Sequence, residues 1–139
     1  MTAAKIQTKE MMSSIIQHFA DELDCSYSDI HVCIYSDDNE KVIPKYDIWV
    51  NKAPFKKDIP FDDLLSIYTN IDVFQIKLIA PAYIKALLEK LAYDTKCDVD
   101  KLKVFIVSNG DVENLRYLVY SATTNEWIKE INLKYIFDN

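Results

Sequence analysis

The sequence predicts a mixed α/β domain of the α+β class, with one mixed sheet of five to six strands and two main helices. Apolar residues recur at helical intervals in two long segments, and they alternate in several segments of strand length. The 139 residues contain no linker-like stretch, so we expect residues 1–139 to form a single domain. The expected order of elements is α-β-β-(α)-β-α-β-β, followed by a strand or a helix.

The first helix is predicted near residues 6–24. Five apolar residues of this segment recur at helical intervals and fall on one face: Met12, Ile15, Ile16, Phe19 and Leu23. The mainly polar segment 25–29 breaks this pattern. We therefore expect an amphipathic helix that packs one side against the core and ends before residue 25.

A hairpin of two strands is predicted next. Apolar residues alternate with other residues over 30–35 and again over 46–50, as in half-buried strands. The polar run 36–40 between them consists of turn-forming residues. Pro44 near the start of the second strand favours an edge position or a bulge. We expect residues 51–59 to form a loop.

A short helix, a strand and a long helix are predicted in the middle of the chain. Asp58 and Pro60 resemble a helix start, which predicts a short helix near residues 60–68. Residues 73–79 alternate in polarity and predict a strand. The long helix is expected over 81–94. Its core-facing stripe is predicted to be Ile84, Leu87, Leu88 and Leu91.

Two strands joined by a tight turn are predicted after the long helix. Residues 104–107 form a continuous apolar run, which indicates a buried strand. Asn109 and Gly110 favour a type I′ turn, because both central positions of that turn need a positive φ. The returning strand is expected over 115–121.

Residues 124–136 leave two alternatives open. Thr123 and Glu126 have the spacing of a capping box, which predicts a helix over this segment. The same residues also suit a turn that leads into a strand at 127–131. We expect the strand.

An internal repeat is a further hypothesis. A helix, a short polar loop, a strand and a turn follow one another over residues 12–38 and again over 84–110. Few residues are identical between the two segments, so the sequence leaves the duplication open.

Composition narrows the classes of function. The net charge is −6 and Arg116 is the only arginine, which argues against a dedicated nucleic-acid-binding protein. Three cysteines are an odd number without framework spacing, so we expect reduced thiols and a cytoplasmic location. We expect no secretory signal and no membrane-spanning segment, because no long apolar run occurs.

One candidate catalytic pattern combines Asp47, Gln75 and Lys77. Asp47 lies on the second predicted strand, while Gln75 and Lys77 share one face of the third. This α-β-β-β-α-β order with Asp…Gln-x-Lys resembles the core of the PD-(D/E)xK nuclease superfamily. The resemblance implies that Asp47 binds Mg²⁺ and that Lys77 orients the attacking water. Gln75 occupies the position where that family usually has an acid, which weakens the implied metal site.

Trp49 is the candidate interaction residue. It lies on the face of its strand opposite Tyr46 and Ile48. Either a partner or a helix of the same domain then covers it. Tryptophan and tyrosine are favoured at the energetic centres of protein interfaces.

The sequence therefore favours a non-enzymatic protein-interaction domain without a cofactor. Such a domain acts as an inhibitor, an immunity-type protein or a phage accessory protein that binds a protein partner, or it forms a homo-oligomer. The alternative is a PD-(D/E)xK-like metal-dependent nuclease or an inactive relative of one.

Overall fold

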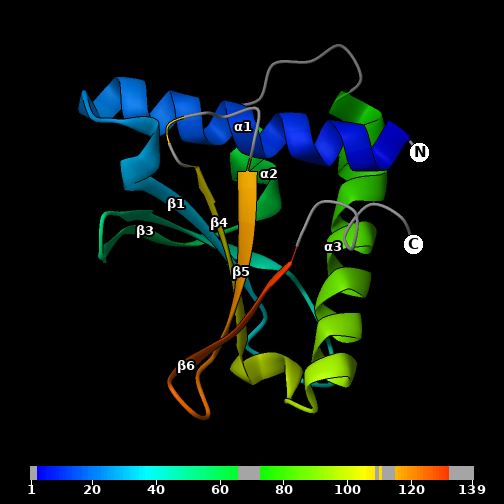
Figure 1. Cartoon of the computed structure of the whole chain (residues 1–139). Coiled ribbons are helices and arrows are strands. Elements are labelled where there is room, and N and C mark those ends of the chain that lie inside the picture. The colour runs from blue at the N-terminus through cyan, green and yellow to red at the C-terminus, as the bar shows by residue number, and fades with distance from the viewer. Residues whose placement is uncertain (1–2, 66–72, 109, 111–114, 132–139) are drawn as a thin grey trace.

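Among the described residues, six strands form one sheet in the order β3-β2-β1-β4-β5-β6 (Figure 1). The computed structural model describes residues 3–65, 73–108, 110 and 115–131. The strands are β1 (Ile30–Tyr35), β2 (Lys45–Val50), β3 (Ala53–Ile59), β4 (Leu102–Ser108), β5 (Leu115–Ser121) and β6 (Glu126–Ile131). The helices are α1 (Ala3–Leu23), α2 (Phe61–Leu65) and α3 (Val73–Thr95), with short 3-10 helices η1 (Tyr27–Asp29) and η2 (Val99–Lys101). The predicted α+β fold is confirmed.

The neighbouring strands of the described sheet are all antiparallel, rather than mixed as expected. The expectation of a parallel pair depended on a strand over residues 73–79 next to the strand at 104–107. The structure has a helix over residues 73–79, so the crossover that parallel strands require is absent there.

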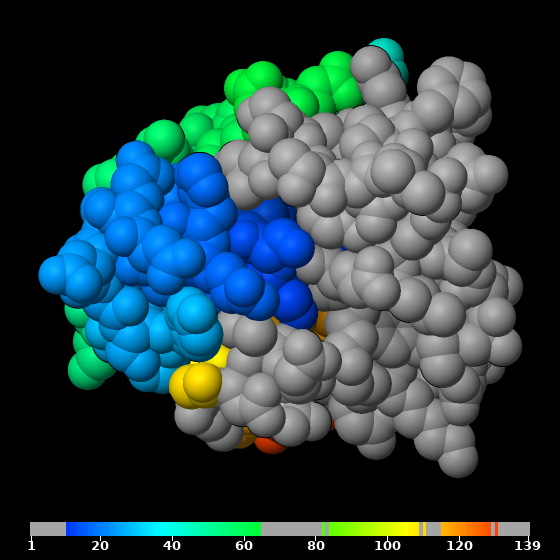
Figure 2. All heavy atoms as spheres, turned by 90° about the horizontal axis from the view of Figure 1, so that it is seen from above, coloured from blue at the N-terminus to red at the C-terminus, as the bar shows by residue number. Residues whose placement is uncertain are grey.

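The two long helices pack on one face of the sheet, α1 across its upper end and α3 along one side (Figure 1). Successive side chains of a strand point to opposite faces, so alternate residues of each strand reach this core. Core residues from the central strands are Ile30, Val32, Ile34, Leu102, Val104 and Ile106. The predicted stripe of α3 is buried as expected. Seen from above, the C-terminal half of α1 and the segment after it form one continuous surface (Figure 2).

The predicted strand over residues 73–79 is wrong, because this segment is the first part of α3. Its residues are mostly apolar, and a short apolar run fits a strand and a buried helix equally well. Pro81 was expected to begin the helix, yet the helical backbone runs through it from Val73 to Thr95. The proline lacks the N–H for one helical hydrogen bond, and the remaining turns keep the helix continuous.

The predicted loop over residues 51–59 is also wrong, because Ala53–Ile59 forms the edge strand β3. Its side chains are nearly all exposed, so no apolar alternation marks it in the sequence. Two register irregularities against β2, together with Pro54, make it a bulged edge. Such features are typical of sheet edges that avoid pairing with other chains.

The other predicted elements are confirmed. β1 and β2 form the expected antiparallel hairpin, and β4 pairs with the returning strand β5. Gly110 has a φ of +94°, which favours glycine, whereas Asn109 lies outside the described residues. Of the two alternatives for residues 124–136, the strand is confirmed, because Glu126–Ile131 forms β6. Residues 132–136 lie outside the described part. α2 is the expected short helix. Residues 66–68, which the prediction included, lie outside the described part of the chain.

The structure shows the same order of elements twice, and the internal duplication itself stays a hypothesis. The order α1-η1-β1-β2-β3 recurs as α3-η2-β4-β5-β6. The helix ends match in detail, since Cys25 N–H donates to Ala20 O and Cys97 N–H donates to Ala92 O, both at 3.0 Å. The residue before each of these cysteines has a φ of +54°, the left-handed conformation typical of a helix end.

The two repeats meet at the pairing of β1 with β4. Cys33 pairs with Phe105, which is the residue 72 positions later and occupies the same place in the second repeat. Val32 pairs with Ile106, and Ile34 pairs with Val104, so exchanging the repeats leaves the register unchanged. An approximate two-fold axis therefore passes between Cys33 and Phe105.

No helix in the described part of the chain is long and apolar enough to cross a membrane.

The first test concerns this core. Leu88 of α3 and its repeat counterpart Ile16 of α1 are both fully buried. We expect Leu88→Ala and Ile16→Ala each to lower the free energy of unfolding by about 2–5 kcal/mol, because each leaves a cavity. Glu89→Ala, at an exposed position beside Leu88, should change it by less than about 0.5 kcal/mol. Urea denaturation followed by circular dichroism measures all three. A Leu88→Ala cost as small as that of Glu89→Ala would contradict the packing.

Candidate functional site

The face of the sheet opposite α1 and α3 carries a second apolar cluster. Its buried members are Cys33, Phe105 and Val107, and its partly buried members are Tyr35, Trp49, Leu118 and Tyr120. No residue from a described helix belongs to this cluster. Trp127 of β6 contacts its rings and is 57% exposed. We name this surface, formed by these eight residues, the aromatic face.

The rings of the aromatic face contact one another in a continuous row across four strands. Trp49 meets Phe105 edge-to-face, with 5.4 Å between ring centroids. Trp127 lies between Phe105 and Tyr120, at 5.3 Å from each. Tilted and edge-to-face contacts at such distances are attractive beyond the apolar area that they bury. The row therefore holds its rings in fixed positions on a hydrogen-bonded sheet.

A pocket of about 480 Å³ opens on the aromatic face. Phe105 and Val107 are almost fully buried and form its floor. Half-buried or exposed rings from β2, β5 and β6 surround this floor. Polar side chains complete the lining: His31, Asn51, Lys52 and Lys103. No carboxylate is among the described residues that line it. We name this hollow the aromatic pocket.

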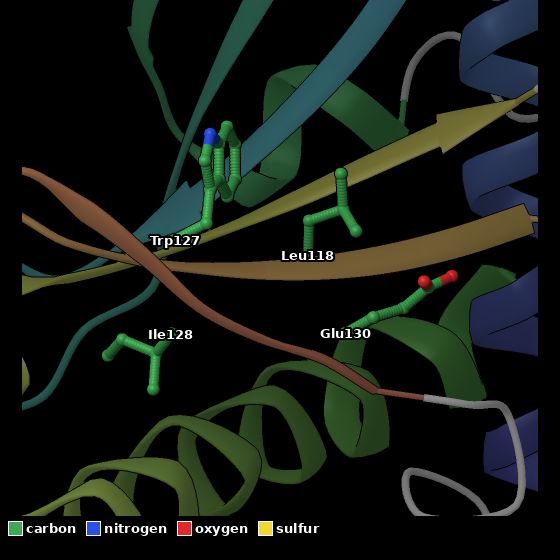
Figure 3. A pocket seen from close by; sticks show the side chains of 4 residues that line it. All are labelled: Leu118, Trp127, Ile128 and Glu130. Atoms are coloured by element: carbon green, nitrogen blue, oxygen red, sulfur yellow. The ribbon is translucent and has the colours of Figure 1, made fainter.

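A smaller hollow of about 300 Å³ lies beside it on β5 and β6, lined by Leu118, Trp127, Ile128 and Glu130. The register of β6 shifts between the partners of Val119 and Tyr120, which leaves Ile128 as an extra residue. Trp127, Leu118 and Glu130 consequently project to one side of β6 and Ile128 to the other (Figure 3). Arg116 holds Glu130 through two hydrogen bonds, of 2.7 and 3.1 Å.

Asp47 is buried beneath the edge of the aromatic face, at 5% exposure. Its Oδ1 accepts a hydrogen bond of 2.9 Å from the backbone N–H of Asp58 in β3. The Tyr35 hydroxyl donates to the Asp58 carboxylate. Burial, followed by the nearby Asp58 and Asp47 carboxylates, raises the pKa of Tyr35 above its ordinary value. Asp47 thus fixes the bulge at Asp58, where φ is +55°.

Gln75 and Lys77 lie on a helix and not on a strand beside Asp47. Asp47 pairs with Cys33 and shares the face of Trp49, whereas α3 packs on the opposite face. Gln75 and Lys77 lie on the first turns of α3, and their side chains are outside the described part. The nuclease resemblance required both residues on a strand beside Asp47, and that strand is absent. Among the described side chains, no three potential metal ligands gather.

Trp49 lies on the aromatic face as the alternation predicted. No described helix covers it; its neighbour Phe105 does so in part. Its Nε1 is buried and finds no acceptor among the described residues. Trp127 was not predicted as a site residue, because the sequence left the secondary structure of its segment open between a strand and a helix. Residues 126–130 read Glu-Trp-Ile-Lys-Glu and do not alternate, so no period-2 signal marked Trp127 as a residue of one face.

Cys33 supplies a test of how closely the rings cover this face. Burial, then the charge of Asp47, raises the pKa of its thiol from 9.0 to about 12. The unfolded chain releases this proton from about pH 9, whereas the folded protein keeps it to about pH 12. This thiol therefore leaves the free energy of unfolding unchanged below pH 9 and lowers it as pH rises toward 12, by up to about 1.4 kcal/mol per pH unit.

Urea denaturation between about pH 8 and pH 11 measures this dependence. We expect Cys33→Ala to show a shallower loss of stability with rising pH than the unchanged protein. Equal slopes for the two proteins would show that the Cys33 thiol is not shielded in the folded state.

Comparison with known proteins found no match to any protein-family model, to any curated protein or to any solved structure.

Proposed function

We propose that this protein is a non-enzymatic protein-interaction domain that binds its partner through the aromatic face. The observation that supports this most is Trp127, which is 57% exposed and continues a row of rings on a sheet face that no described helix covers. Interface centres are enriched in tryptophan and tyrosine. Trp49 and Tyr120, both half-buried, extend the same surface.

The rigidity of this surface favours tight binding. Binding normally costs free energy for each side chain that becomes ordered. Here the rings already contact one another, and they stand on strands whose backbone is paired on both sides, apart from the outer strand β6. A partner therefore meets a surface whose shape is set in advance. An inhibitor, an immunity-type protein or a phage accessory protein acts by such binding alone.

The three thiols support a reducing location such as the cytoplasm for this binding. Cys25, Cys33 and Cys97 are all free, and Cys33 lies fully buried in the centre of the aromatic face. Cysteines of secreted proteins usually form disulfides.

Alanine substitution of the two tryptophans tests the proposal. We expect Trp127→Ala and Trp49→Ala each to weaken partner binding by about 2 kcal/mol or more, roughly 30-fold in Kd, because each removes a large ring from the contact. The tagged protein recovers its partner from the cells that carry its gene. Calorimetry with the purified partner then gives Kd for each variant.

Phe55→Ala is the matched control for these variants. Phe55 is an aromatic residue of β3 with 46% exposure, yet it faces Phe19 of α1 at 6.4 Å and is not part of the aromatic face. We expect this change to leave Kd nearly unaltered. A loss as large as that of Trp127→Ala would contradict the proposal. Light scattering over a range of concentrations shows whether the partner is a second copy of the chain.

A further inference from the structure

The aromatic pocket differs in charge from the rest of the molecule. The chain carries a net charge of −6, whereas the described residues that line the pocket include two lysines and a histidine and no carboxylate. Lys52 and Lys103 make no ion pair within the described residues, although the Lys103 Nζ lies 5.9 Å from the ring centroid of Tyr35. Positive groups without a counter-charge, beside low-dielectric aromatic walls, attract an anion more strongly than the same groups in open water.

Trp49 adds an unused hydrogen-bond donor to the pocket wall. Its Nε1 is buried and has no acceptor in the described part of the chain. Buried donors are nearly always paired in folded proteins, with protein, water or ligand. The ring itself lines the pocket. An acceptor atom on a bound molecule is therefore a suitable partner for this N–H.

The size and walls of the pocket limit its occupant further. Its volume of about 480 Å³ lies in the usual range for small-molecule sites, roughly 300–1,000 Å³. Trp127 presents a largely exposed indole against which a flat ring can stack. The net negative charge of the protein opposes a long polyanion, whereas a small ligand meets only the local lysines.

We propose that the aromatic pocket binds a planar aromatic anion of the nucleoside phosphate class. The base stacks on the row of rings between Trp49 and Trp127, and the phosphate reaches one of the two lysines at the rim, Lys52 after the Trp49 end of β2 or Lys103 opposite Tyr35 and Tyr120. Base–aromatic stacking tolerates any of the bases, because each has a π-face. This inference goes beyond the proposed protein interaction and is testable with the purified protein alone. A negative result for one proposal therefore does not disprove the other.

Intrinsic fluorescence reports directly on this pocket, because Trp49 and Trp127 are the only tryptophans of the chain and both line it. The purified protein is titrated with the four ribonucleoside monophosphates, and calorimetry confirms each Kd. Adenosine, ribose 5-phosphate and inorganic phosphate are the matched probes that lack either the charge or the ring. We expect saturable quenching by the monophosphates, and binding at least about tenfold weaker for all three partial probes.

Charge reversal of the two lysines assigns the binding to this pocket. Lys52→Glu and Lys103→Glu should each weaken binding of adenosine monophosphate by about tenfold or more. The control is Lys41→Glu, an exposed position in the β1–β2 connection, at the opposite end of β1 from His31. It should leave Kd within about twofold. Thermal unfolding of each variant confirms that it is folded.

Several results would overturn the proposal. The first is the absence of saturable binding by any monophosphate up to about millimolar concentration, a range in which a specific pocket of this size should respond. Others are adenosine or inorganic phosphate binding as tightly as adenosine monophosphate, or Lys41→Glu acting like Lys52→Glu. Tighter binding of a single-stranded RNA oligomer than of any monophosphate would assign this face to nucleic acid instead.

Discussion

The antiparallel pairing of β1 with β4 is the interaction on which the rest of the structure depends, because it joins the two repeats into one sheet with one shared core. Each repeat supplies one long helix and three strands. A sheet of three strands under a single helix buries little apolar surface. The pairing places β1 and β4 at the centre of six strands and brings both helices to one face. The core residues of β1 and β4 then meet one another as well as the helices.

The same arrangement creates the aromatic face, because two helices on one side leave the other side to the strands themselves. The backbone follows the repeat there, but the side chains do not. Trp49 of β2 lies opposite His31 of β1. The matching place in the second repeat holds Tyr120 of β5, which lies opposite Lys103 of β4. Asp47 and Leu118 occupy the next matching pair of places, opposite Cys33 and Phe105. A symmetric scaffold therefore carries the Asp47 and Asp58 carboxylates on β2 and β3, and beside them the aromatic pocket with Lys52 and Lys103 at its rim. This difference between the two repeats gives the face its chemistry.

Much of the fold was predictable, because local apolar patterns determine it. The helix stripe ending in Leu91 and the alternation of β1 and β2 identified buried faces correctly. The edge strand β3 escaped because solvent surrounds its side chains, and residues 73–79 were misassigned because apolar runs lack a distinguishing period. The site was less accessible to prediction. The pocket requires β1 to pair with β4 and β5 to pair with β6. The first of these pairings joins residues as much as 74 positions apart, Val32 and Ile106. The bulge at Ile128 then sets the direction in which Glu130 points.

The two proposed binding events share Trp49 and Trp127, so they are coupled by necessity, and the structure indicates the sign. A partner that docks over an empty pocket seals a void and takes Lys52 and Lys103 out of water without a counter-charge. Both effects oppose binding, since a void forfeits contacts and an unpaired buried charge is costly. An anion already seated there fills the void and neutralises the lysines. A ligand that fills the pocket and leaves the outer face of the Trp127 indole free would therefore strengthen the partner's binding, and by reciprocity the partner would strengthen the ligand's binding by the same factor. Only a ligand that projects above Trp127 would reverse this sign, because it would hold the partner away from the exposed indole.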